Sequence, residues 1–344
     1  MKKKSKFFRT LLDIIFWKKS QPANEVKIKS DNGSNNISNS NVKREITSNQ
    51  NHLEYIDDDK YKELKNTLFL NWCDGKKLDV EYPRYFSSRY NMKNLDAKHK
   101  KLIEDGSLIK ASDDLIFKNM TVSELKEVLR KYNLKVSGKK QELIDRLIDN
   151  NIKAPTDIND IFILSDKGKE FIKENHPWIT YHKFSMHNIT EAEFVSVWNQ
   201  LKASYKFTPP GNDIVWKILS DRAIKAQLNN KFTDFRFARH GMFDVLVDEN
   251  KISGAVKFAI EICTIDLSGL NNYPINKYNK PVIFLAPYFV NYIANNMEYY
   301  NESGFEFIKN YENISVMSVS KMKYYLEKSF VDFDAVEEEL RKKY

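Results

Sequence analysis

The chain has 344 residues, of which 42% are hydrophobic and 30% charged, a globular rather than a disordered composition. Two cysteines are too few for a disulfide framework and fit a reducing, cytoplasmic setting. Ten glycines and nine prolines leave little room for many short strands and tight turns. We therefore expect a mainly α, multi-domain protein.

The formal net charge of +8 is unevenly distributed along the chain. Residues 1–19 contain seven Lys or Arg and one Asp, so this segment carries +6 and the other 325 residues carry only +2. The overall charge is therefore a weak argument for nucleic-acid binding. Local clusters of cations have to carry that argument.

Residues 1–19 predict a basic amphipathic helix, because Phe8, Leu11, Leu12 and Ile15 recur at helical spacing on one face. No stretch of the sequence has the roughly 20 mostly apolar residues that a membrane span requires. Two interpretations stay open: a helix on an anionic membrane surface, and a helix that docks on protein. Residues 20–54, rich in Ser, Asn and Lys, are expected to be a disordered linker.

Residues 55–118 and 151–187 predict a small α+β frame around a central module. Helices are expected at 58–70, 96–104 and 166–172, and strands at 107–110, 115–117 and 161–164. Gly106 has the place of a C-capping glycine. The order helix, glycine, strand, later strand and closing helix resembles a winged helix. That resemblance implies that the module is inserted in the wing; the alternative is a common local pattern without this meaning.

Residues 119–150 predict a compact pair of helices. Thr121 and Glu124 have the spacing of a capping box that begins the first helix, and Ser137–Gly138 is expected to begin the second. Apolar Leu134 and Val136 indicate a packed connecting loop. The predicted buried face comprises Val122, Leu125, Val128, Leu129, Tyr132, Leu143, Ile144, Leu147 and Ile148.

Basic residues surround this loop and the start of the second helix: Arg130, Lys131, Lys135, Lys139, Lys140 and Arg146. The first turn of a helix offers unpaired N–H groups and the positive end of the helix dipole, and both bind phosphate. Gly138 would let a ligand approach the backbone closely.

The segment resembles a SAP domain, a helix-loop-helix module with a Leu-x-Val-Ser-Gly-x-Lys loop, here Leu134–Lys140, and a Glu-Leu-Ile-x-Arg-Leu helix, here Glu142–Leu147. The resemblance implies binding to double-stranded DNA, often AT-rich, with weak sequence preference. RNA binding and protein docking stay open as alternatives. Carried over by position, the DNA-facing residues would be Lys135, Ser137, Gly138, Lys139, Lys140 and Arg146, with Arg130 and Lys131 beside them.

Residues 188–344 predict a helical domain for partner binding or self-association. Helices are expected at 190–201, 212–228, 232–247, 254–267, 288–300 and 331–344, the first with a capping box at Thr190 and Glu193. A second basic, aromatic surface for nucleic acid is conceivable, but a core covered by arginine stems is the favoured interpretation. The residues concerned are Arg222, Lys225, Arg236, Arg239, Phe232, Phe235, Phe237 and Phe243.

No catalytic motif stands out. Asp244 and Glu261 could be carboxylates of a metal-dependent nuclease, but both are expected on helices and no lysine follows two residues after Glu261. His176, His182 and His187 fit no zinc spacing.

We therefore expect a cytoplasmic DNA-binding protein that is not an enzyme, without cofactor or metal, whose SAP-like module tethers the helical domain to duplex DNA. It would be peripheral at the membrane if residues 1–19 bind lipid. The alternatives are a nuclease or recombination factor with an unrecognised C-terminal site, and a membrane-surface adaptor whose module docks a protein.

Overall fold

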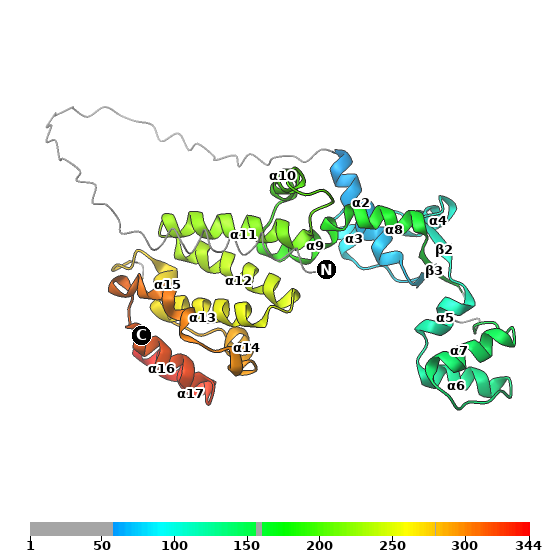
Figure 1. The fold of residues 1–344 in the computed structure, drawn as a ribbon. Coiled ribbons are helices and arrows are strands. Elements are labelled where there is room, and N and C mark those ends of the chain that lie inside the picture. The colour runs from blue at the N-terminus through cyan, green and yellow to red at the C-terminus, as the bar shows by residue number, and fades with distance from the viewer. Residues whose placement is uncertain (1–57, 156–159, 279) are drawn as a thin grey trace. The chain divides into compact units, whose positions relative to one another are not determined.

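The computed structural model describes residues 58–155, 160–278 and 280–344 (Figure 1). The helix expected at 1–19 and the linker expected at 20–54 lie outside these residues. The described part is mainly helical and contains one three-stranded sheet, in agreement with the predicted class. None of its helices is both long enough and apolar enough to cross a bilayer.

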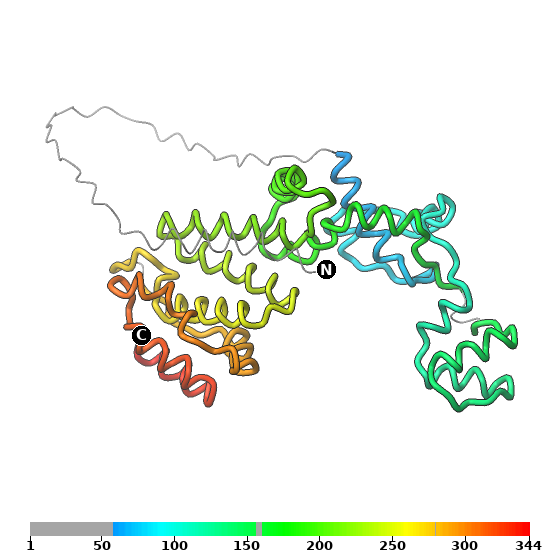
Figure 2. The backbone as a smooth tube through the Cα atoms, in the orientation of Figure 1, coloured from blue at the N-terminus to red at the C-terminus, as the bar shows by residue number. Residues whose placement is uncertain are grey.

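The frame is built around the sheet, whose strand order is β1-β3-β2 with both outer strands antiparallel to β3. Gly106 follows α4 with a φ of +77°, as expected for a C-capping glycine. The chain leaves β2 into the module and returns in β3 (Figure 2). The strands predicted at 107–110 and 161–164 pair with each other. The frame elements are α2 (Asp58–Cys73), β1 (Lys76–Lys77), α3 (Tyr85–Ser88), α4 (Leu95–Glu104), β2 (Leu108–Lys110), β3 (Ile161–Leu164) and α8 (Asp166–Asn175).

The strand predicted at 115–117 is wrong, because this segment is helix α5 (Asp113–Asn119). The Ser112 side chain accepts a hydrogen bond from the Leu115 N–H at 3.4 Å and caps the helix. Asp113 and Asp114 then occupy the first turn, where acidic residues interact favourably with the helix dipole. The Ser112-Asp113-Asp114 sequence that precedes the predicted strand is thus the beginning of a helix.

The module contains α6 (Val122–Lys131) and α7 (Lys140–Asp149), and it has a core of its own. Ile116 and Phe117 of α5 join that core, so three helices rather than two enclose it. Val122, Tyr132 and Ile148 are 39%, 44% and 39% exposed, so their predicted burial is wrong. All three lie at helix ends, which so small a core does not cover. The buried residues are Ala111, Ile116, Phe117, Met120, Leu125, Val128, Leu129, Leu143, Ile144, Leu147 and Ala154.

The C-terminal half is a set of helices in which α11, α12 and α13 pack as successive neighbours (Figure 1). α13 is the most deeply placed, since every residue from Ala259 to Ser268 is buried. The helix expected at 288–300 ends at Ala294, before two asparagines of poor helix propensity. The helices are α9 (Pro177–Lys183), α10 (Glu191–Lys202), α11 (Gly211–Leu228), α12 (Phe232–Asp248), α13 (Ile252–Ser268), α14 (Pro287–Ala294), α15 (Glu306–Lys309), α16 (Val319–Ser329) and α17 (Phe333–Lys343), with short 3₁₀ turns between some of them.

One hydrophobic core runs from Leu64 in α2 to Leu340 in α17. It includes buried side chains of both the frame and the C-terminal helices, such as Leu164 and Trp178. The domain boundary expected between residues 187 and 188 therefore stays a prediction, because buried residues on both sides of it belong to the same core. The core of the module is a second cluster of buried residues, separate from this one.

Candidate nucleic-acid interface

The capping box predicted at the start of α6 is present. The Thr121 N–H donates to Glu124 Oε2 at 2.6 Å, and the Glu124 N–H donates to Thr121 Oγ1 at 3.3 Å. The hydrogen bond from the Thr121 backbone lowers the pKa of the Glu124 carboxyl. The box sets where α6 begins, and therefore brings Arg130 and Lys131 into its last turn beside the loop.

The loop between α6 and α7 is packed, as expected. The Leu134 N–H donates to the Leu129 carbonyl at 2.9 Å, and Leu134 and Val136 lie half-buried against the module's core. Gly138 has a φ of +136°, a conformation that residues with a side chain rarely adopt. A Cβ atom at this position would also lie 2.5 Å from Glu142 Oε2. The turn into α7 therefore requires glycine.

α7 begins at Lys140, two to three residues later than the predicted start at Ser137–Gly138. Lys139 is the N-cap residue, with extended backbone, and no side chain caps this end of the helix. Lys135 and Lys139 are exposed, and neither makes an ion pair with any residue that the structure describes. Two available ammonium groups thus flank an uncapped helix N-terminus, where the helix dipole also attracts anions.

Two of the predicted DNA-facing residues also make hydrogen bonds within the module. Lys140 Nζ donates to the Lys118 carbonyl in the last turn of α5 at 2.7 Å. Arg146 Nη1 donates to the Lys135 carbonyl and, at 3.3 Å, to the Ser137 carbonyl. Arg146 therefore holds the loop from α7 and positions Lys135. The sequence gives no direct signal for this role, because a cation near a loop has the same appearance whichever group it binds.

The other residues near the loop differ in their effect on its positive charge. Arg130, Lys131 and Ser137 are exposed, and the two cations extend the positive surface from the loop along the end of α6. Glu142 stands in the first turn of α7 and reduces the positive potential there. The surface as a whole is basic around the loop.

The two carboxylates considered for a nuclease lie on α12 and α13, as predicted, and each faces cationic or ionisable groups. Asp244 Oδ2 lies 2.9 Å from His187 Nε2 and 3.6 Å from His240 Nε2. Glu261 Oε2 lies 3.0 Å from Arg239 Nε. Asp244 therefore faces two histidines and Glu261 faces an arginine, and the two carboxylates have separate partners.

The three histidines noted in the sequence have separate partners. His182 Nδ1 lies 2.7 Å from the Tyr90 hydroxyl, and His176 Nδ1 lies 2.9 Å from the Lys173 carbonyl. His187 faces Asp244. Across the described residues, no three His, Cys, Asp or Glu side chains are grouped so that they could hold a metal ion.

The predicted second basic surface divides into two parts. Arg236 pairs with the fully buried Asp266, and the Arg239 guanidinium lies between the rings of Phe235 and Phe258, 4.8 and 4.5 Å from their centroids. Phe232, Phe235 and Phe243 are buried, so these side chains form the core that was the favoured interpretation. Phe237, in contrast, is 60% exposed.

The capping box predicted at Thr190 and Glu193 is only half formed. The Glu193 N–H donates to Thr190 Oγ1 at 3.2 Å, as in a capping box. The Glu193 side chain, however, accepts a hydrogen bond from Arg222 Nε at 3.0 Å. The stronger charged partner on α11 has replaced the backbone N–H that a capping box would use.

Comparison with known proteins identifies one segment of the chain. The family model of the SAP domain matches residues 116–150. No curated protein and no solved structure matches the chain. The match begins inside α5, in keeping with the contribution of Ile116 and Phe117 to the module's core. This family points to nucleic-acid binding in general, and residues 116–150 are a SAP domain, inserted between β2 and β3 of the frame.

Proposed function

We propose that the SAP domain binds the backbone of duplex DNA with weak sequence preference and thereby tethers the rest of the chain to DNA. The observation that carries this proposal is the pair Lys135 and Lys139, which make no ion pair with any described residue, beside the start of α7, where the N-cap side chain makes no capping hydrogen bond. Phosphate oxygens would accept hydrogen bonds from the first N–H groups of the helix and ion pairs from the two ammonium groups.

The small number of such contacts limits the affinity. A backbone-only interface has a Kd on the order of 10⁻⁴–10⁻⁶ M at physiological salt. Contacts to phosphate and sugar carry no direct sequence information. The domain is therefore suited to holding another activity near DNA, and we assign that other activity to partner binding by the C-terminal helices rather than to catalysis. The separate pairing of Asp244 and Glu261 supports this choice.

Fluorescence anisotropy of a labelled AT-rich duplex, titrated with the full chain between about 50 and 200 mM salt, tests the proposal. Lys135→Gln/Lys139→Gln should weaken binding and reduce the slope of log K against log salt by about two. The matched control is Lys202→Gln/Lys206→Gln, which removes two exposed lysines outside the SAP domain and should leave both quantities unchanged. Unchanged binding by the loop variant would contradict the proposal.

The basic N-terminal segment needs its own control, because it could bind DNA by charge alone. Lys→Gln at the four lysines of residues 2–6 measures the contribution of four of its seven cations. Arg146→Lys tests the positioning role, since lysine keeps the charge but its side chain is one bond shorter than the Nη1 atom that reaches both carbonyls. We expect Arg146→Lys to lower the affinity while the salt slope stays near that of the wild type.

A further inference from the structure

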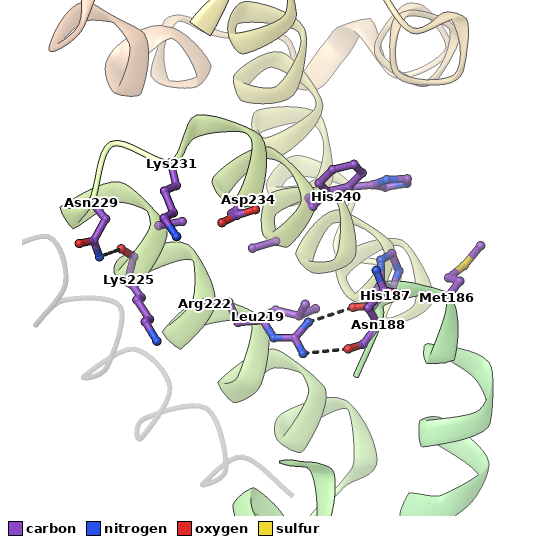
Figure 3. A pocket seen from close by; sticks show the side chains of 13 residues that line it. Met186, His187, Asn188, Leu219, Arg222, Lys225, Asn229, Lys231, Asp234 and His240 are labelled. Atoms are coloured by element: carbon purple, nitrogen blue, oxygen red, sulfur yellow. Dashed lines mark hydrogen bonds between the residues drawn. The ribbon is translucent and has the colours of Figure 1, made fainter. Parts of the chain in front are cut away.

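A cavity of about 650 Å³ is lined by residues of α11 and α12 and by Met186, His187 and Asn188 (Figure 3). Its floor is formed by Leu219, Ala226 and Ala238, all buried, and the two alanines leave the space that larger side chains would fill. The size lies within the range of 300–1,000 Å³ that is typical of small-molecule sites.

The cations at this cavity are not equivalent. Arg222 is fully engaged: its Nη1 donates to the His187 carbonyl and its Nη2 to the Asn188 carbonyl, each at 2.9 Å, and its Nε binds Glu193. Arg222 therefore fixes the wall of the cavity (Figure 3). Lys225 and Lys231 are exposed, and neither makes an ion pair or side-chain hydrogen bond with any residue in the described part of the chain.

The other lining groups are of different chemistry. Asp234 contributes a carboxylate, and His240 an imidazole. Phe237 is 60% exposed at the cavity, whereas Phe232 and Phe235 on the same helix are at most 2% exposed. An aromatic ring left open beside a cavity offers a surface on which a planar group can stack.

We propose that this cavity binds a nucleotide, with Lys225 and Lys231 at its phosphate, Phe237 against its base and Asp234 accepting a hydrogen bond from sugar or base. A simple anion would gain from the two lysines but would be repelled by Asp234. A nucleotide carries phosphate, N–H or O–H donors and a flat ring, and so uses all three kinds of lining group. The nucleotide is either free or one unit of a single strand.

The proposal is independent of duplex binding by the SAP domain. Its test therefore uses the full chain with Lys135→Gln/Lys139→Gln as the starting protein. One arm follows the anisotropy of a labelled single-stranded oligonucleotide of mixed sequence. The other arm titrates ADP, GDP, CDP and UDP calorimetrically. Binding in the first arm alone identifies a strand, and binding in the second identifies a free nucleotide.

Adding Lys225→Ala/Lys231→Ala should weaken binding of whichever probe binds by at least tenfold. Adding Phe237→Ala should weaken it by roughly fivefold to a hundredfold, the range for loss of one base stacked on an aromatic ring. Lys202→Ala/Lys206→Ala, the matched control, should leave the affinity unchanged. Because Lys225, Lys231 and Phe237 are exposed, these variants should fold, and circular dichroism checks this.

Two results would overturn the proposal. The first is the absence of binding of either probe at low salt. The second is binding that the cavity variants leave unchanged, or that the control pair reduces equally, because that would indicate attraction to basic residues elsewhere.

Discussion

The SAP domain and helix α12 both carry clustered cations, and the two regions use them in opposite ways. In the SAP domain, Lys135 and Lys139 extend from the surface without a partner among the described residues. On α12, Arg236 is paired with Asp266, which has no exposed side-chain surface, and Arg239 faces Glu261 between two phenylalanine rings. From the sequence, a nucleic-acid surface is considered in both places, although on α12 a core covered by arginine stems is the favoured interpretation.

The difference lies in what stands opposite the cations in space. Helix α13, in which every residue from Ala259 to Ser268 is buried, supplies Glu261 and Asp266, which are five residues apart. Burial raises the pKa of Asp266, and Arg236 opposes that increase by favouring the ionised form. A cation is available for a ligand only where no such acid faces it, and the acid belongs to another part of the sequence.

The largest expected difference between the two regions is in the free energy of unfolding after loss of a cation. Arg236→Ala leaves Asp266 buried without its main partner, and we expect the free energy of unfolding to fall by about 3–5 kcal/mol. Urea denaturation followed by tryptophan fluorescence measures this, since Trp72, Trp178, Trp198 and Trp216 lie outside the SAP domain.

Arg236→Met/Asp266→Leu removes both charges and should recover much of that stability. Lys139→Ala removes an exposed cation of the SAP domain and should change the free energy of unfolding by less than about 0.5 kcal/mol. Equal effects of Arg236→Ala and Lys139→Ala would mean that the two regions do not differ as described.

The second test concerns the separate core of the SAP domain. Leu143 has no exposed surface, so Leu143→Ala should destabilise the domain by about 2–5 kcal/mol. Amide hydrogen exchange of residues 116–150 should accelerate, and duplex binding should be lost, while the tryptophan-detected transition stays in place. Ile148→Ala, on the same helix but 39% exposed, is the matched control. A shift of the tryptophan transition would show that the two cores unfold together.

The same contrast explains which predictions from sequence succeeded. The capping box of α6, the strands β2 and β3 and the helices α11, α12 and α13 follow from local signals: cap residues, strand propensity and helical periodicity. The roles of Arg146 and Lys140 depend on carbonyl groups of other segments, and the cavity at Lys225 depends on how α11 meets α12. Such contacts follow from tertiary packing, which periodicity does not encode.

A third test bears on the SAP loop itself. Gly138→Ala places a side chain at a φ of +136° and near Glu142, and should cost the domain more than about 1 kcal/mol. Gly138→Ala/Glu142→Ala removes the contact but keeps the backbone strain, so it should restore only part of the loss. Hydrogen exchange of the loop and duplex affinity measure both. Full recovery in the double variant would show that the contact, and not the backbone conformation, requires glycine.

The smallest expected difference between the SAP domain and the large core is in how their stability depends on pH. Burial lowers the pKa of His99, whose ring lies beside the Tyr82 hydroxyl, and of His182, whose ring lies beside the Tyr90 hydroxyl. Residues 116–150 contain no histidine. The SAP domain should therefore keep its stability between about pH 7.5 and 5.5, where histidines titrate, and the large core should not.

The sign follows from proton uptake. Above the ordinary histidine pKa near 6.5, both rings are neutral in the folded and unfolded chain and contribute no pH dependence. As the pH falls below it, the unfolded chain takes up protons that the folded chain refuses until its lowered pKa is reached. The large core therefore loses stability on acidification, by no more than about 1.4 kcal/mol per pH unit for each histidine. Tryptophan-detected urea transitions of wild type and His99→Phe measure the slope. An equal slope in both proteins would remove His99 as a cause, and parallel acid sensitivity of the SAP domain would show that the source lies in carboxylates common to both regions.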